Sequence, residues 1–114
     1  MTVLIAGTVD IAAPGRDRAL ADRAEVQAQT REQQGGLHSV GSADPASQTR
    51  VYVYEHWACT DDLAAHLAGP CYAQMLALLG AYEVSNTQVS KFKVALEEPV
   101  YDPEGRPRAD YFTE

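Results

Sequence analysis

Three side chains in the middle of the sequence could take part in hydrogen bonding or proton transfer. Trp57 has an indole N–H that can only donate, and its flat ring could stack on a planar molecule. His66, with an ordinary pKa of about 6.5, could take up or release a proton at neutral pH. Tyr72 lies six positions later and could supply another donor. Each of these residue types also packs in protein cores, so a structural role is the alternative for all three.

Three further residues extend this set of candidates. His38 could be another proton carrier, or it could simply be exposed. Arg31 could stabilise an anion, although its neighbour Glu32 favours a solvated or ion-paired role. Glu55, if it faces the interior, is a buried carboxylate that needs a partner, such as Arg31 or a backbone amide. The structural role is the stronger reading of each, and all three are kept as candidates for substrate binding.

The cysteines and glycines give no sign of a metal or nucleotide site. Cys59 and Cys71 are twelve positions apart, without a C-x-x-C pair or a second set of metal ligands. We expect two free thiols and no zinc. The chain also lacks the G-x-G-x-x-G pattern of dinucleotide-binding proteins. The sequence therefore predicts no metal and no bound nucleotide.

Length and charge limit the classes of protein that the chain can represent. Its 114 residues suit one domain with one core, and 46% of them are hydrophobic. A net charge of −7, with only nine scattered Lys and Arg residues, argues against nucleic-acid binding. No apolar run approaches the ~18 residues of a membrane span, and the first residues lack a signal-peptide pattern. We expect a cytoplasmic protein that binds neither nucleic acid nor membrane.

The candidate residues must be positioned by a short series of strands and helices. β-branched content, helix-forming runs and the places of Gly and Pro predict each element. We expect strands over residues 2–11, 37–43, 50–58 and 88–96, one unbroken helix over 16–34, and a second helix split into 63–68 and 71–79. Thr60 is the expected N-cap of the split helix. This β-α-β-β-α-β order predicts an α+β, ferredoxin-like fold: a four-stranded antiparallel sheet with the helices on one face.

The third strand does not alternate apolar and polar residues as a strand with one solvated face would. Val51, Val53, Glu55 and Trp57 share one side, and Tyr52, Tyr54 and His56 share the other. The helices can cover only one of these sides, and the sequence does not decide which. A bare aromatic sheet face is uncommon on a monomer. We therefore predict a two-fold homodimer with sheets face to face, and His56, opposite in parity to Trp57, on the dimer face.

The last residues form a separate feature. Residues 1–98 make up the predicted domain, and residues 99–114 make up a C-terminal extension with three prolines. Its apolar and aromatic residues are Val100, Tyr101, Tyr111 and Phe112. Prolines reduce the entropy that is lost when such an arm is laid on a surface. We expect the extension to wrap onto the partner subunit, and the alternative is a disordered tail.

With these elements in place, the chain resembles the antibiotic biosynthesis monooxygenase family of dimeric α/β-barrel proteins. The resemblance rests on "TREQQGGLHSV" at residues 30–40 and "YEHWACTDDLAAHLAGPCYAQML" at residues 54–76. The matching positions are Arg31, Glu32, Gly35, Glu55, Trp57 and His66. The likeness covers residues 3–96, and it implies the dimeric α/β-barrel form of the ferredoxin-like fold.

The sequence departs from the family pattern at two places. The Pro-Gly-Cys that often follows the Arg-Glu pair is replaced by Gln33, Gln34 and two glycines. Relatives that degrade haem place a haem-ligating His near the position of Leu76, and no His stands there. Haem degradation is therefore not expected. Because the superfamily hosts several activities, the resemblance implies the fold more firmly than the chemistry.

The resemblance implies a cofactor-independent monooxygenase, an oxidoreductase that acts with O2 on a small aromatic phenol or quinol. Oxygen reacts more readily with a phenolate than with a neutral phenol, so such a site must favour the anion. His66 and Trp57 would be catalytic, as base and donor, with Tyr72, His38, Arg31 and Glu55 around the substrate. Two alternatives stay open: an isomerase or epimerase of a small carbonyl compound, and a non-enzymatic dimer that binds a small ligand.

Overall fold

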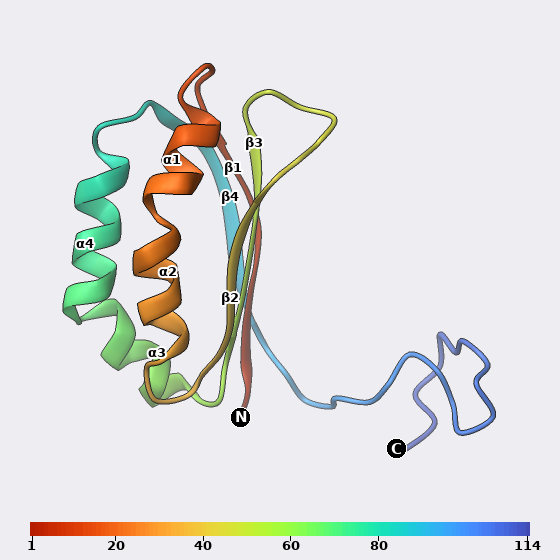
Figure 1. Ribbon diagram of the computed structural model, residues 1–114. Helices are drawn as coiled ribbons and strands as arrows, with labels where there is room; N and C mark the ends of the chain where they lie inside the picture. Colours follow the sequence, from red (N-terminus) through yellow and green to blue (C-terminus); the bar gives the residue numbers. More distant parts are fainter.

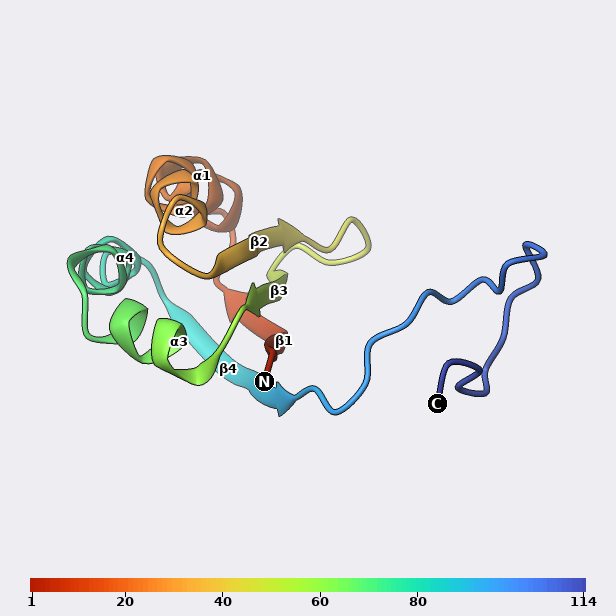
Figure 2. The same cartoon turned by 90° about the horizontal axis from the view of Figure 1, so that it is seen from below.

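The computed structural model describes residues 1–114 and contains four strands and four helices (Figure 1). They are β1 (Val3–Ile11), α1 (Arg16–Asp22), α2 (Ala24–Arg31), β2 (Gly36–Ala43), β3 (Arg50–Trp57), α3 (Thr60–Leu67), α4 (Pro70–Leu79) and β4 (Val84–Lys93). The strands form one antiparallel sheet in the order β2-β3-β1-β4. Figure 2 shows the helices on one side of this sheet. The predicted ferredoxin-like, α+β fold is confirmed.

Two small apolar clusters hold the helices against the sheet, one near each end of the strands. Val3, Trp57 and Leu63 form one cluster, and Ile11, Ala19 and Val51 form the other. Burial of Val51 and Trp57 places their side of β3 under the helices, which decides the face that the sequence left open. α4 lies outermost, against α1, α2 and α3. None of the four helices has the length and apolar character to cross a membrane.

The prediction of one unbroken helix over residues 16–34 is wrong. The helix is divided at Arg23, which joins α1 and α2, although helical bonds from Arg23 N–H to Ala19 and from Gln27 N–H to Arg23 cross the junction. It also ends earlier than predicted, at Arg31. The chain turns there through Gly35, whose φ of 76° lies in the left-handed region that glycine adopts without steric cost. The Gly-Gly pair thus marks the turn itself and the start of β2.

Two other predicted boundaries are wrong. Thr60 is the first residue of α3, and the N-cap is the extended Cys59, whose carbonyl accepts the N–H of Leu63. β4 begins four residues earlier and ends three residues earlier than predicted. The pairing with β1 explains this shift, because Lys93 is opposite Val3, the first residue of β1, and Val84 is opposite Ile11, the last. Beyond Lys93 the neighbouring strand has ended.

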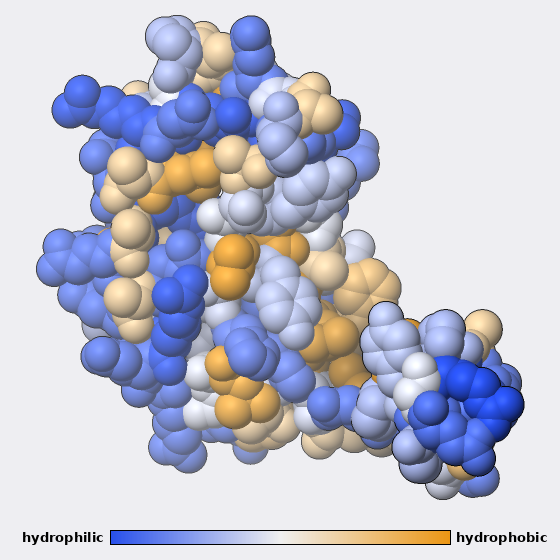
Figure 3. Space-filling view, turned by 45° about the vertical axis from the view of Figure 1, so that its right-hand side comes forward, coloured by the Kyte–Doolittle hydropathy of each residue, from blue (hydrophilic) through white to orange (hydrophobic).

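The side of the sheet opposite the helices carries aromatic residues that the chain leaves bare. Tyr52 is 50% exposed and Phe92 is 52% exposed, and Val40 and Tyr54 are also exposed there. His56 lies on this side too, because it has the parity of Tyr52 and Tyr54. Figure 3 shows apolar surface in the region between the body of the molecule and its tail.

Residues 94–114 run away from the sheet on this uncovered side and form a small lobe (Figures 1 and 2). The lobe is ordered by its own bonds: Tyr101 pairs with Pro107, and the Glu98 carboxylate accepts the backbone N–H groups of Phe112 and Thr113. The Arg108 guanidinium lies 5.5 Å from the centre of the Phe112 ring. The tail thus has internal structure of its own, without helix or strand.

Candidate active site

Trp57 and Glu55 form a hydrogen-bonded pair on the helix side of β3. They are two positions apart on one strand, so their side chains point the same way. Trp57 is fully buried, and its indole N–H donates to Glu55 Oε1 at 2.7 Å. This bond supplies the partner that a carboxylate in the interior needs. The partner expected for Glu55, Arg31, instead donates its Nε–H to the carbonyl of Ser39 at 2.8 Å.

His66 lies on α3 directly over the Trp57 ring. The two rings are stacked, with centres 4.7 Å apart and planes 29° apart. Tyr72, near the start of α4, meets the imidazole edge-on at 5.7 Å. The fold therefore brings together three of the residues that the sequence singled out, on three different elements. His66 itself is buried, with 6% of its surface exposed.

Gln33 determines how the imidazole of His66 can act. Its Oε1 lies 2.6 Å from His66 Nδ1. A carbonyl oxygen only accepts, so this contact requires the proton on Nδ1 and leaves the lone pair on Nε2. The sequence does not mark Gln33 as functional, because a single glutamine in a turn gives no periodic signal that would single it out. His66 is thus oriented as a base that accepts at Nε2.

Burial and a neighbouring carboxylate shift the pKa of His66 in opposite directions. Burial lowers the pKa of His66 from its usual 6.5, and the nearby Glu55 carboxylate partly opposes this by favouring the imidazolium. The result is a neutral imidazole at pH 7, with a carboxylate close enough to stabilise a positive charge once a proton is taken. This is the electrostatic arrangement of a general base.

Two polar residues of the helix layer, Arg23 and Gln27, are buried beside the same sheet face. Burial lowers the pKa of Arg23, and Glu55 again opposes the shift. Arg23 Nε and Gln27 Nε2 have no hydrogen-bond partner, and Arg23 lies against the backbone of Gly41 in β2. The sequence signal was the thin apolar stripe of this helix, which leaves polar residues to fill its inner face. The layer between α2 and the sheet is therefore unusually polar.

The remaining predicted residues do not join this group. His38 lies on the uncovered side of the sheet, with its ring 5.7 Å from His56 and 6.1 Å from Tyr54. Arg31 is exposed and holds the backbone of β2 as described above. The two cysteines are free thiols, and no group of three or more His, Cys, Asp or Glu side chains is placed to hold a metal ion.

A groove of about 400 Å³ opens beside the Trp57 cluster, between α3 and the edge strand β4. Its lining residues are Val3, Thr60, Leu63, Ala64, Leu67, Lys91, Phe92 and Lys93. Val3 and Leu63 also belong to the apolar cluster that contains Trp57, so the groove adjoins the packing around Trp57, although neither Trp57 nor His66 lines it. A volume of this size suits a small organic molecule.

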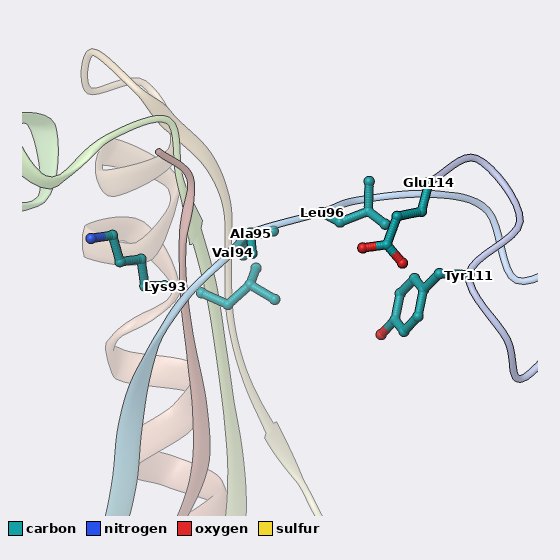
Figure 4. Close-up of a pocket in the computed structure, with 7 residues that line it drawn as sticks. Lys93, Val94, Ala95, Leu96, Tyr111 and Glu114 are labelled. Carbon is teal, nitrogen blue, oxygen red and sulfur yellow. The ribbon is translucent and has the colours of Figure 1, made fainter.

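A second hollow, of about 440 Å³, lies on the other side of the sheet, where β4 continues into the tail. Leu4, Val94, Leu96 and Tyr111 contribute to its lining. Figure 4 shows Lys93 at the edge of this hollow, pointing away from Leu96 and Tyr111. The hollow is thus formed by the uncovered face and the tail lobe, and the sheet separates it from His66.

Comparisons with known proteins place this architecture among solved structures. No family model and no curated protein matches the sequence. A structure from Deinococcus radiodurans, described as a "putative antibiotic biosynthesis monooxygenase", is similar with a TM-score of 0.77 and 19% identity, over 90% of this chain and 100% of the other.

Two other structures repeat the likeness. One from Chloroflexus aurantiacus, described in the same words, has a TM-score of 0.71 and 16% identity over 87% of this chain and 98% of the other. One from Bacteroides thetaiotaomicron, described as a "possible oxidoreductase", has a TM-score of 0.69 and 18% identity over 80% of this chain and 95% of the other. At these identities the likeness concerns the fold. The chain therefore has the fold of proteins described as a "putative antibiotic biosynthesis monooxygenase".

Proposed function

We propose that this protein is a cofactor-independent monooxygenase of a small aromatic phenol or quinol. The observation that carries the proposal is the neutral, buried His66, held by Gln33 with the Nε2 lone pair free and placed on the Trp57 ring beside Glu55. A phenol can be deprotonated at neutral pH by such a base. The fold shared with proteins described as a "putative antibiotic biosynthesis monooxygenase" and as a "possible oxidoreductase" supports the same class of reaction.

In the proposed reaction His66 Nε2 takes the phenolic proton, and the Glu55 carboxylate stabilises the imidazolium that forms. The phenolate then reacts with O2. One oxygen atom enters the ring and becomes a quinone oxygen, and the other leaves as water, so that a phenol and O2 give a quinone and water. The substrate supplies all four electrons, and no other reductant is required. Burial of the site strengthens each electrostatic contact.

The hydrogen bond to Glu55 gives Trp57 a role that differs from the one expected. Its single donor is already used, so it does not stabilise the phenolate while this bond is kept. In the proposal Trp57 is a positioning residue that holds the Glu55 carboxylate and supports the imidazole ring of His66. Tyr72, edge-on to His66, supplies a hydroxyl group that can donate a hydrogen bond to the substrate oxygen.

We also propose that two copies pack through the uncovered sheet faces and that each tail lobe lies on the other copy. The exposed aromatic side chains of the sheet and the exposed Val100, Tyr101 and Tyr111 of the lobe support this arrangement, since such area is costly to leave in water. The lobe, already folded, would lose little conformational freedom on docking. His38 and His56 would then lie in the dimer interface.

The test is oxygen consumption with a panel of hydroquinones and hydroxynaphthalenes. We expect uptake of one O2 per quinone formed, a loss of about a hundredfold or more in kcat for His66→Ala, and an unchanged initial rate for His38→Ala, whose side chain lies on the other face. Equal rates for His66→Ala and the wild type would refute the assignment of the base. No uptake, together with exchange of the α-deuterium of a carbonyl compound, would assign the site to an isomerase.

A further inference from the structure

The groove between α3 and β4 contains both lysines of the whole chain. Lys91 and Lys93 are the only lysines among 114 residues, and both line this groove. They are opposite Ile5 and Val3 in the sheet, so their side chains lie on the side of the helices. Figure 4 shows Lys93 pointing away from the tail hollow, in agreement with that placement. Two positive charges are thus gathered on a protein whose net charge is −7.

Neither lysine is neutralised by the protein. The ion pairs of the structure all involve arginine, and no carboxylate is among the residues that line the groove. The rest of the lining is mainly apolar and comes from Val3 and from the α3 residues Leu63, Ala64 and Leu67. The groove therefore combines an apolar wall with an uncompensated positive rim.

We propose that this groove binds a small aromatic carboxylate, with its ring on the apolar wall and its anionic group at Lys91 and Lys93. The volume of about 400 Å³ accommodates a molecule of one or two fused rings. The charge arrangement favours an anion over a neutral molecule of the same shape. The inference rests on the proposed function only in making this ligand the substrate: the phenol or quinol would carry a carboxylate.

An edge strand can also carry lysines merely to prevent pairing with another sheet. Prevention of strand pairing requires charge on the strand, but it requires neither an apolar wall nor a preference of the groove for anionic ligands. The two explanations therefore differ in what they predict for a pair of molecules that share a ring system and differ in charge.

The experiment measures binding by calorimetry for 2-naphthoate and for its neutral counterpart 2-naphthalenemethanol, in the absence of turnover. We expect the wild type to bind the carboxylate about tenfold or more tightly than the alcohol, and Lys91→Gln with Lys93→Gln to abolish that difference. The control is Arg18→Gln with Arg106→Gln, which removes two exposed positive charges elsewhere and should keep the preference. Equal affinity of the wild type for both molecules, or no binding of either, overturns the proposal. If the control double variant loses the preference for the carboxylate to the same extent, the proposal is overturned as well.

A second pair of variants tests the location. Ala64→Trp places an indole in the groove, whereas Ala65→Trp adds the same side chain to an exposed position of α3 that does not line it. We expect naphthoate binding to be lost only in Ala64→Trp, with circular dichroism showing that both variants fold. Retained binding in a folded Ala64→Trp places the ligand elsewhere. Because binding is scored without oxygen, a failure here is distinct from a failure of the proposed oxidation.

Discussion

His66 Nδ1 lies 2.6 Å from Gln33 Oε1, a contact that ties α3 to the turn between α2 and β2. The contact joins residues 33 positions apart and fixes which nitrogen of the ring is free. The base of the proposed reaction is therefore defined jointly by α3 and by a turn whose Gln33 precedes His66 by 33 residues.

Replacement of Gln33 by Leu removes the acceptor and frees the imidazole to change tautomer and orientation. We expect kcat to fall about tenfold or more while the fold is kept, because a charge-neutral hydrogen bond of this kind contributes roughly 1 kcal/mol and its loss also misplaces Nε2. Gln34→Leu is the matched control, since Gln34 is exposed and has no side-chain bond. Steady-state rates for the two variants give the comparison. A normal rate in Gln33→Leu would show that the contact does not orient the base.

The pH dependence of catalysis should report the protonation of His66. Burial lowers the pKa of His66, so kcat/KM should stay high below pH 6.5 and fall only when the imidazole becomes protonated. Glu55→Gln keeps an acceptor for Trp57 but removes the charge that favours the imidazolium, so the acid limb should move to still lower pH. Glu25→Gln, an exposed substitution on α2, should leave it in place. A shift of the Glu55→Gln limb to higher pH would contradict the electrostatic argument.

The same lowered pKa has a consequence for folding. As the pH falls, His66 of the unfolded chain is protonated at about pH 6.5, before His66 of the folded protein, so the contribution of neutral His66 is complete above that pH. It is lost as the pH falls from there through the lower pKa of the folded state. Urea denaturation of the wild type and of His66→Gln at a series of pH values should show a steeper decline for the wild type in that window. Parallel curves would argue against burial as the cause.

Trp57→Phe removes one hydrogen-bond donor, the indole N–H, from a fully buried position while keeping an aromatic ring. Glu55 Oε1 then loses its donor, and we expect the free energy of unfolding to fall by about 2–3 kcal/mol. The double variant Trp57→Phe with Glu55→Leu should recover part of that loss, because no unpaired polar group remains. Chemical denaturation of the four proteins of this cycle measures the coupling. Additive losses would show that the pair contributes no coupling energy.

Removal of the residues after Glu98 should weaken the proposed dimer. The truncation deletes the lobe with its exposed Val100, Tyr101 and Tyr111, and we expect the dissociation constant from sedimentation to rise about tenfold or more. Loss of Glu114 alone, the last residue, should leave it unchanged. An unaltered dissociation constant after truncation at Glu98 would remove the lobe from the interface, and a monomeric wild type would refute the dimer as well.

The order of the elements could be predicted because strands and helices each left a clear local pattern in the sequence. The inner face of β3 could not be chosen, since both of its sides are apolar or aromatic and only the position of α3 over Trp57 separates them. The bounds of β4 were missed because they are set by the length of β1, a partner more than seventy residues away. Local propensity contains no such information.

Only part of the candidate site could be predicted, because residue type reveals some of its members and tertiary contacts reveal the others. Trp57, His66 and Tyr72 were found because their side chains have chemistry that is uncommon enough to notice, and the fold brings them together. Gln33, Arg23 and Gln27 have ordinary helix or turn residues as neighbours and become notable only through burial or a partner. Tertiary contacts, not residue type, reveal their positions.

The pairing of two lysines in one groove also determines how this protein responds to amine-directed reagents. Agents directed at primary amines can react at the N-terminus, Lys91 and Lys93, because the sequence offers no other lysine. Attachment to a surface through either lysine would anchor the molecule by its groove wall and obstruct that opening. Carbamylation or acetylation removes both positive charges from the groove and, under the proposed binding mode, its preference for an anion.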